Sequence, residues 1–122
     1  MTNTFKVGQY IKSRLDTIGN VETYPVIATE GAKDPYIVYQ RTGLEESRTK
    51  DGQVYDEVQY DILVASQSYK RSVELIQQVR EKLRPCKLED FRISDVKTVD
   101  SKEGYDDNYY LQNIIMIFRV ER

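Results

Sequence analysis

One run of apolar residues near the C-terminus constrains the fold of this chain more than any other feature. Residues 114–118 read Ile-Ile-Met-Ile-Phe, and successive side chains of a strand point to opposite faces of its sheet. A strand made of this run is therefore apolar on both faces. Such a strand lies in the middle of a sheet beneath a helix, or it is covered by another subunit. We predict a strand over residues 109–120 in one of these two settings.

The N-terminal segment, residues 4–18, has the spacing of an amphipathic helix. Its apolar side chains recur at intervals of four, four and three residues, which places them on one stripe of a helix. They are Val7, Ile11, Leu15 and Ile18. Thr4 is the expected N-cap, and Gly19-Asn20 is the expected C-terminal stop.

A second amphipathic helix is predicted over residues 69–83. Its apolar face would be formed by Tyr69, Val73, Ile76, Val79 and Leu83. Ser66 or Ser68 would cap its N-terminus, and Pro85 would end it. Its other face is basic, with Lys70, Arg71, Arg80, Lys82 and Arg84 set against Glu74 and Glu81.

The remaining segments indicate strands. Residues 21–28 contain Pro25, which favours an edge strand or a bend. Residues 36–40 and 58–64 should form a long hairpin, and residues 92–99 and 109–120 a second pair joined by an acidic turn over residues 100–107. We therefore predict one α+β domain over residues 1–122, in the order α-β-β-β-α-β-β. Five mostly antiparallel strands would carry both helices on one face, because only two helices are available as cover.

The far end of the first hairpin is polar and acidic. A two-residue turn at Asp51-Gly52 would place Glu46 opposite Glu57, which is an unfavourable cross-strand pair. We therefore expect the far end of this hairpin to be slipped in register, mobile, or ordered only by a partner, and residues 44–55 to be mobile in a free subunit and ordered against a neighbour.

Composition argues against an enzyme. The chain has no histidine, so Ser–His and Cys–His nucleophile pairs and most zinc sites are excluded. Cys86 is the single cysteine, and no candidate base stands ready to activate it. The acidic residues Asp100, Glu103, Asp106 and Asp107 lack the ligand spacing of a calcium loop, and a solvated turn is the plainer interpretation. We predict no catalytic, cofactor-binding or metal-binding residues.

Charge and hydropathy limit the partners. The net charge is −2, which argues against a protein whose main task is to bind phosphate. No stretch approaches the roughly 20 apolar residues of a membrane span, and the N-terminus lacks the apolar core of a signal peptide. We expect a cytoplasmic protein without membrane association. The acidic hairpin ends and the basic second helix would suit head-to-tail contacts between copies.

Several local strings lie at fixed places around the two predicted helices. They are YPVIA at 24–28, DPYIVYQ at 34–40, YDILVAS at 60–66, YDD at 105–107 and FRV at 118–120. Their order resembles that of the bacteriophage tail-completion proteins, also called tail-terminator or tail-to-head joining proteins. The resemblance covers about residues 5–121 and rests on order and spacing, without an invariant motif.

The resemblance implies a non-enzymatic virion protein that forms a ring, typically a hexamer. Such a ring sits at the head-proximal end of the tail, where it stops the tail-tube protein from polymerising and docks on the head connector. Assembly takes place in the bacterial cytoplasm, and DNA passes through the lumen without specific binding. Two other classes stay open. One is a small ligand-binding or regulatory module similar to ferredoxin-like domains, which would need a formed pocket. The other is a nucleic-acid-binding protein, which would need exposed aromatics continuous with the basic helix face.

Overall fold

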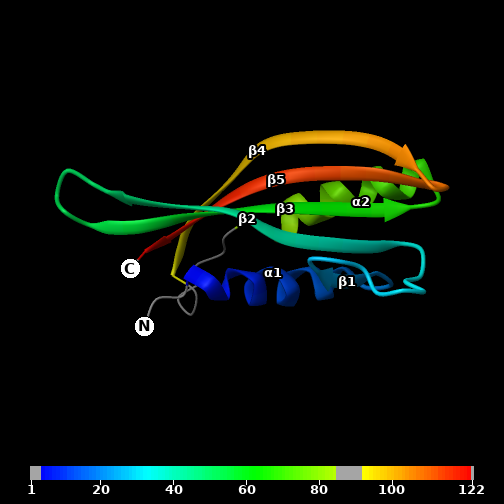
Figure 1. The fold of residues 1–122 in the computed structure, drawn as a ribbon, viewed down its shortest axis with the longest axis horizontal. Helices are drawn as coiled ribbons and strands as arrows, with labels where there is room; N and C mark the ends of the chain where they lie inside the picture. Colours follow the sequence, from blue (N-terminus) through cyan, green and yellow to red (C-terminus); the bar gives the residue numbers. More distant parts are fainter. Residues whose placement is uncertain (1–3, 85–91, 122) are drawn as a thin grey trace.

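A computed structural model describes residues 4–84 and 92–121, and the expectations for Pro85 and Cys86 lie outside these residues. The chain forms an α+β fold with two α-helices and a five-stranded sheet (Figure 1). The elements in chain order are 3-10 helix η1 (Thr4–Lys6), α1 (Val7–Leu15), 3-10 helix η2 (Asp16–Ile18), β1 (Glu22–Pro25), β2 (Tyr36–Arg48), β3 (Val54–Ser66), α2 (Tyr69–Lys82), β4 (Ile93–Asp106) and β5 (Tyr109–Glu121). The predicted order α-β-β-β-α-β-β is confirmed.

The sheet is mixed but mostly antiparallel, with the spatial order β1-β2-β3-β5-β4. Strand β1 runs parallel to β2, and the other neighbours pair antiparallel. The apolar strand β5 lies between β3 and β4, as its sequence predicts. Pro25 ends β1 at the edge of the sheet, where its missing N–H removes no ladder hydrogen bond.

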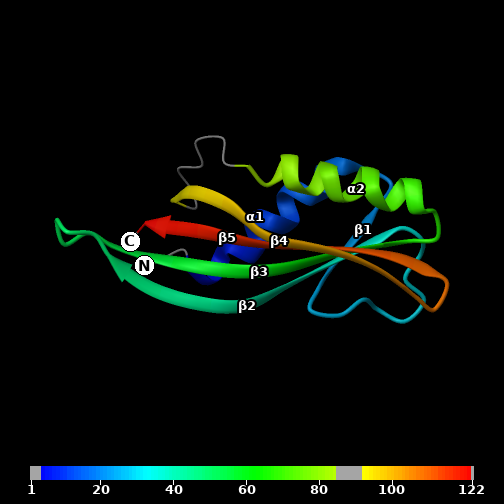
Figure 2. The ribbon, with the colours of Figure 1, turned by 90° about the horizontal axis from the view of Figure 1, so that it is seen from above.

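Both helices pack on one face of the sheet (Figure 2). Val7, Ile11 and Leu15 of α1 are fully buried in the same cluster as Leu75 and Val79 of α2. On β3 and β5 every second side chain joins this cluster, because the alternation of a strand turns those residues toward the helices. They are Val58, Tyr60, Ile62, Val64, Ile114, Met116, Phe118 and Val120.

The buried face of α2 differs from the prediction. Ser72, Leu75 and Val79 face the sheet, whereas Tyr69 is 49% exposed and Val73 is 37% exposed. The small polar Ser72 can lie close to the sheet, where its hydroxyl is 3.4 Å from the amide nitrogen of Gln112. Because Ser72 approaches the sheet closely, α2 buries a different face from the one that its apolar periodicity predicts. Ser68 is the N-cap, as expected, and its hydroxyl accepts from the Arg71 N–H at 3.3 Å.

Helix α1 secures the C-terminal end of α2. The Tyr10 hydroxyl donates to the Leu83 carbonyl at 3.2 Å, and the Arg14 Nε donates to the Lys82 carbonyl at 2.8 Å. The last carbonyls of a helix have no partner within it, so these two donors supply what α2 lacks. Thr4 begins η1 rather than capping it, and its hydroxyl donates to the buried Asp56 of β3.

Two predicted turns differ in length. The first hairpin closes through Thr49 and Gln53, with Gly52 at φ +86°, which is the left-handed residue of a three-residue turn with a bulge. The register therefore places Glu45 opposite Glu57, which is slipped by one residue from the pairing of Glu46 with Glu57 that a two-residue turn would give.

The second hairpin has a much shorter turn than the sequence suggested. Strand β4 continues to Asp106, so the acidic segment 100–107 is mostly strand. Pairing with β5 keeps this polar segment extended. The turn itself is Asp107-Asn108, and both residues have positive φ, as a two-residue type I′ turn requires.

Candidate assembly surfaces

The sheet face opposite the helices is covered by neither α1 nor α2. We call it the open sheet face, and its apolar residues come from alternate positions of β2, β3 and β5. They are Val38, Leu63, Leu111, Ile115 and Ile117, all half-buried. A groove of about 460 Å³ lies over part of this face, bordered by Val26 from the loop after β1. Uncovered apolar side chains on a sheet face make it a candidate interaction surface.

Polar groups within the open sheet face are paired with one another. The Asn113 amide donates to the Asp61 carboxylate on the neighbouring strand β3, and it lies 3.5 Å from the Ile62 carbonyl. This pairing satisfies the two side chains at the centre of the face. The open sheet face therefore has an apolar centre with paired polar groups, and Glu57, Gln59 and Arg119, at alternate positions on the same face, make its remainder polar.

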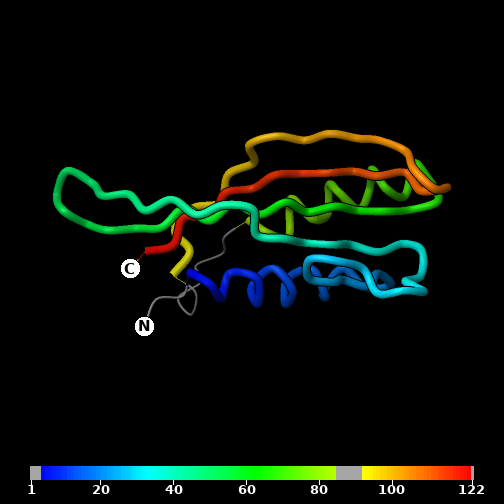
Figure 3. Tube along the Cα trace, viewed as in Figure 1, coloured from blue at the N-terminus to red at the C-terminus, as the bar shows by residue number. Residues whose placement is uncertain are grey.

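The β2–β3 hairpin projects beyond the rest of the sheet (Figures 1 and 3). Two acidic pairs cross it, Glu45 opposite Glu57 and Glu46 opposite Asp56. Asp56 is only 2% exposed and accepts the Thr4 hydroxyl, so it belongs to the packed base of the hairpin and not to its acidic surface. The sequence suggested an acidic hairpin end made of Glu45, Glu46, Asp51, Asp56 and Glu57, and Asp56 does not contribute to that surface.

The opposite end of the sheet is rich in tyrosine. Tyr105 lies against Tyr110 with ring centroids 4.9 Å apart, and Tyr110 lies 5.5 Å from Tyr69. The Tyr69 hydroxyl donates to Glu103 at 3.0 Å, and this hydrogen bond raises the pKa of Tyr69. Glu103 therefore has a structural role, and the solvated-turn interpretation is too simple for it. Tyr105 itself is 60% exposed.

A groove of about 650 Å³ separates α1 from the outer edge of β2. Its lining includes Phe5, Val26 and Arg41, with the Arg41 guanidinium 4.7 Å from the centre of the Phe5 ring. Lys12 and Asp16 also line it, and they are joined by a 3.0 Å ion pair. Burial by itself raises the pKa of the Asp16 carboxyl, but hydrogen bonds from Lys12 and Thr23 outweigh burial and bring that pKa below its usual range.

A ligand-binding module requires polar groups that converge on a bound small molecule. The Lys12 ammonium does not point into this groove, because it also donates to the Thr23 hydroxyl at 3.1 Å and its donors are directed into the α1–β1 junction. The Arg41 guanidinium is a second cation at the side of the groove, where it lies over the Phe5 ring.

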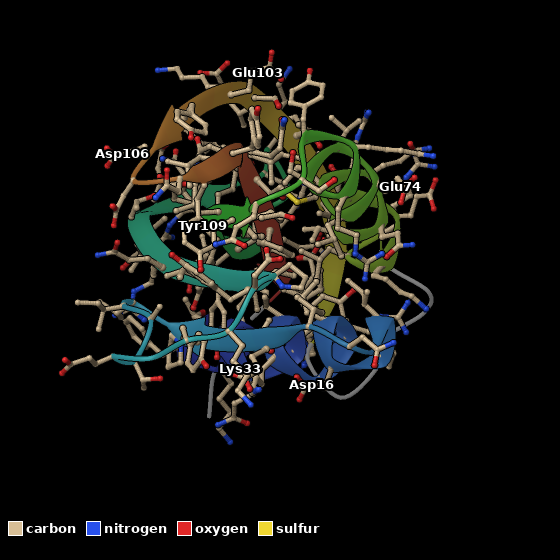
Figure 4. The ribbon with its side chains drawn as sticks, turned by 90° about the vertical axis from the view of Figure 1, so that its right-hand side faces the viewer. Asp16, Lys33, Glu74, Glu103, Asp106 and Tyr109 are labelled. Carbon is tan, nitrogen blue, oxygen red and sulfur yellow. The ribbon has the colours of Figure 1, made fainter. Side chains whose placement is uncertain are left out.

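The outer face of α2 carries the predicted basic residues, but it is not uniformly positive. Lys70, Arg80 and Arg84 are exposed, and Glu74 and Glu81 are exposed among them. Figure 4 shows Glu74 on the side of the molecule away from Asp106. A nucleic-acid surface needs a continuous basic patch with stacking aromatics, and the nearest aromatic, Tyr69, is bound to Glu103.

The acidic side chains form no metal site in the part of the chain that the structure describes. No three potential ligands come together within residues 4–84 and 92–121. In the same ranges, none of the helices has the length and apolar character needed to cross a bilayer. Sequence reasoning missed the open sheet face as a unit, because its residues are scattered over three strands. The apolar run 114–118, which has residues on both faces, was the signal that could have revealed it.

Comparisons with known proteins bear on the fold. No protein-family model matches the sequence, and no curated protein is detectably similar to it. Among solved structures, the chain is similar to one in the virion of a native gene transfer agent particle, with a TM-score of 0.69, 12% identity, and coverage of 89% of this chain and 84% of that one.

A second similar structure is the PVC sheath/tube terminator of an extracellular contractile injection system in the extended state. The TM-score is 0.53 at 12% identity, with 97% of this chain covering 56% of that one. This chain thus spans a little over half the length of that terminator. At such low identity, both similarities establish a shared fold.

Proposed function

We propose that this protein is a structural component of a phage-like particle, a tail terminator that forms a ring at the head-proximal end of the tail tube. It would stop the tail-tube protein from adding further subunits, and it would join the tail to the head connector. The observation that carries the proposal is the uncovered, apolar sheet face in a fold shared with a virion chain and with a sheath/tube terminator. A ring of copies and its neighbours in the tail would provide the missing cover.

The projecting hairpin is proposed to become ordered on assembly. Residues 44–55 carry Glu45 opposite Glu57, and most of these residues are exposed, so we expect weak stabilisation of the hairpin in a free subunit. We expect rapid amide hydrogen exchange there in a monomeric sample, and slower exchange once the ring forms on a tail tube. Strong protection of residues 44–55 in the monomer would contradict this prediction.

DNA is proposed to pass through the ring without specific binding. The net charge of −2 gives the ring no general affinity for phosphate, so a duplex could slide past it. A ring that retained DNA at physiological salt would contradict this part of the proposal.

Sedimentation provides the main test. Free subunits are expected to sediment as monomers, because a terminator must not assemble before the tube presents its end, and polar contacts are weak alone. Addition of the tail-tube protein from the same genome should produce rings bound to tube ends and should arrest tube growth. The comparison is made at low and high salt, since charge contacts weaken with salt. A stable two-fold dimer that ignores tail tubes would refute the proposed function.

A further inference from the structure

The sheet has two free edges that differ in chemistry. Strand β4 forms one edge along all of Ile93–Asp106, because β5 occupies only its inner side. Strand β2 forms part of the other edge, since β1 pairs only with Tyr36–Tyr39. In the described part of the chain, the outer side of β2 is therefore open over residues 41–48. An open edge presents unpaired N–H and C=O groups that can hydrogen bond to another strand.

The strand directions are compatible with pairing of unlike edges. Strands β2 and β5 run one way, and β3 and β4 run the opposite way. Copies related by rotation about an axis along the strands keep these directions. Strand β4 of one copy then meets β2 of the next in antiparallel orientation. Contacts between two different edges are heterologous, and rotation can close them into a ring.

Side chains on the two edges are complementary at particular positions. Large exposed hydrophobic side chains occur on both edges, with Leu44 on β2 at 45% and Val99 and Tyr105 on β4 at 52% and 60%. Glu45 is exposed on β2, and Lys97 and Lys102 are exposed on β4. Opposite charges across a strand pair are favourable. Lysine on an edge also discourages unwanted pairing. Strand β4 also carries four exposed carboxylates, Asp95, Asp100, Glu103 and Asp106, so its complementarity to Glu45 is local and lies at the lysine positions.

The short strand β1 determines which part of β4 can reach β2. A neighbouring strand cannot occupy the outer side of β2 at Tyr36–Tyr39, because β1 is already there. The β4 strand of the neighbour must therefore be shifted so that its C-terminal half meets residues 41–48. With Glu45 opposite Lys102, the exposed Tyr105 and Asp106 of the neighbour come near Arg41.

The groove between α1 and β2 lies where this hairpin end would arrive. It begins at Pro25 and Val26, where β1 stops, and it includes Phe5 and Arg41. An aromatic ring can pack against Phe5 and Val26, and a carboxylate can pair with the Arg41 guanidinium. The shift that β1 requires thus brings a tyrosine and an aspartate to an apolar groove with a cation at its side.

We propose that copies of this chain join by β-augmentation, with β4 of one subunit pairing antiparallel to β2 residues 41–48 of the next and the β4–β5 turn seated in the groove beside α1. This inference rests on the proposed ring function and names its subunit contact. It predicts a sheet that continues from subunit to subunit around the ring.

Disulfide cross-linking tests the contact in the full chain. In a Cys86→Ser background, Glu45→Cys is combined with Lys102→Cys, so that a head-to-tail contact gives covalent multimers on oxidation. Each single-cysteine variant should stay monomeric. A second pair, Glu45→Cys with Lys97→Cys, reports a register that β1 excludes, because it would place residues 103–106 of the neighbour on the side of β2 that β1 occupies. The matched control joins Glu45→Cys with Glu74→Cys on the outer face of α2. Multimers from the Lys102 position, with none from the Lys97 position or the control, support the proposal, whereas equal multimers from the Lys97 position or in the control overturn it.

A charge exchange provides the second measurement. Glu45→Lys and Lys102→Glu should each lower the association constant of a contact by up to about fivefold, and the combined variant should restore it.

Failure of the proposed contact and failure of the proposed function give different results. If the unmodified protein caps tail tubes as rings but the pair of Glu45→Cys with Lys102→Cys does not cross-link on them, the β4–β2 contact is wrong and the proposed function stands. If Glu45→Cys alone gives disulfide dimers, a two-fold contact replaces the proposed one. If no rings form on tubes, the proposed function itself fails.

Discussion

Replacing Tyr10 with phenylalanine should destabilise the fold by about 1 kcal/mol, with an upper limit near 2 kcal/mol, because the change removes a buried donor and keeps the ring. Tyr10 is 1% exposed, and its hydroxyl lies 3.2 Å from the Leu83 carbonyl and 3.4 Å from that of Arg84. Both carbonyls lie at the C-terminal end of α2, where a helix has no internal donors left. For a chain of this length the melting temperature should fall by roughly 4 °C.

Tyr10→Ala separates the hydroxyl from the ring. The ring packs edge-on against Phe118, with centroids 6.2 Å apart and an interplanar angle of 79°. Loss of a buried aromatic side chain costs about 3–5 kcal/mol, so alanine should be several-fold more damaging than phenylalanine. Urea unfolding followed by circular dichroism, with an unchanged slope, gives the free energies. Tyr105→Phe is the matched control, since Tyr105 is 60% exposed and should change stability by less than about 0.5 kcal/mol. Equal values for Tyr10→Phe and this control would refute the reasoning.

Three further predictions concern the open sheet face, the backbone and the response to alkali. Ile115→Lys should leave a folded monomer that no longer assembles on tail tubes. Ile114→Lys, at a site 3% exposed, should instead unfold the chain. Circular dichroism and sedimentation check both outcomes. Val26→Gly should raise the free energy of unfolding by up to about 1 kcal/mol, because Val26 has φ +67° and a 61% exposed side chain, and a fall in the melting temperature would contradict this. Burial raises the pKa of the Tyr39 and Tyr60 hydroxyls above 10.0. The contribution of these two hydroxyls to folding stability is therefore complete below about pH 10, and it is lost as the pH rises through their pKa values in the folded protein. Between about pH 9 and pH 11, Tyr60→Phe should therefore lose less urea resistance than the unmodified protein.

Local periodicity was sufficient to predict the helices and the inner strand. The stripe of Val7, Ile11 and Leu15 is fully buried as predicted, because three well-spaced apolar side chains leave a helix only one face to bury. The stripe of α2 was misplaced, since a buried serine carries no apolar signal. The run 114–118 predicted an inner strand, and β5 lies between β3 and β4.

The extent of strand β4 and the composition of the open sheet face could not be predicted from local periodicity. The polar β4 segment from Val99 to Asp106 is exposed on both of its faces, so nothing in its composition distinguishes it from a solvated turn. Its extended form comes from hydrogen bonds to β5, which are far along the chain. The open sheet face was hidden for a related reason, because Val38, Leu63 and Leu111 are neighbours only after the sheet has formed. Register creates this surface, and no local motif encodes it.

The two hairpin turns point to opposite ends of the sheet (Figure 1). In a ring whose subunits all have the same sense, every Lys50-Asp51-Gly52 turn would therefore lie on one rim, and every Asp107-Asn108 turn on the other. The two rims would differ in reach, since the β2–β3 hairpin projects beyond its neighbours, and in chemistry, since only the second rim carries Tyr105. A particle built on such a ring could distinguish its tube side from its connector side without any further component, and the ring could not be mounted upside down.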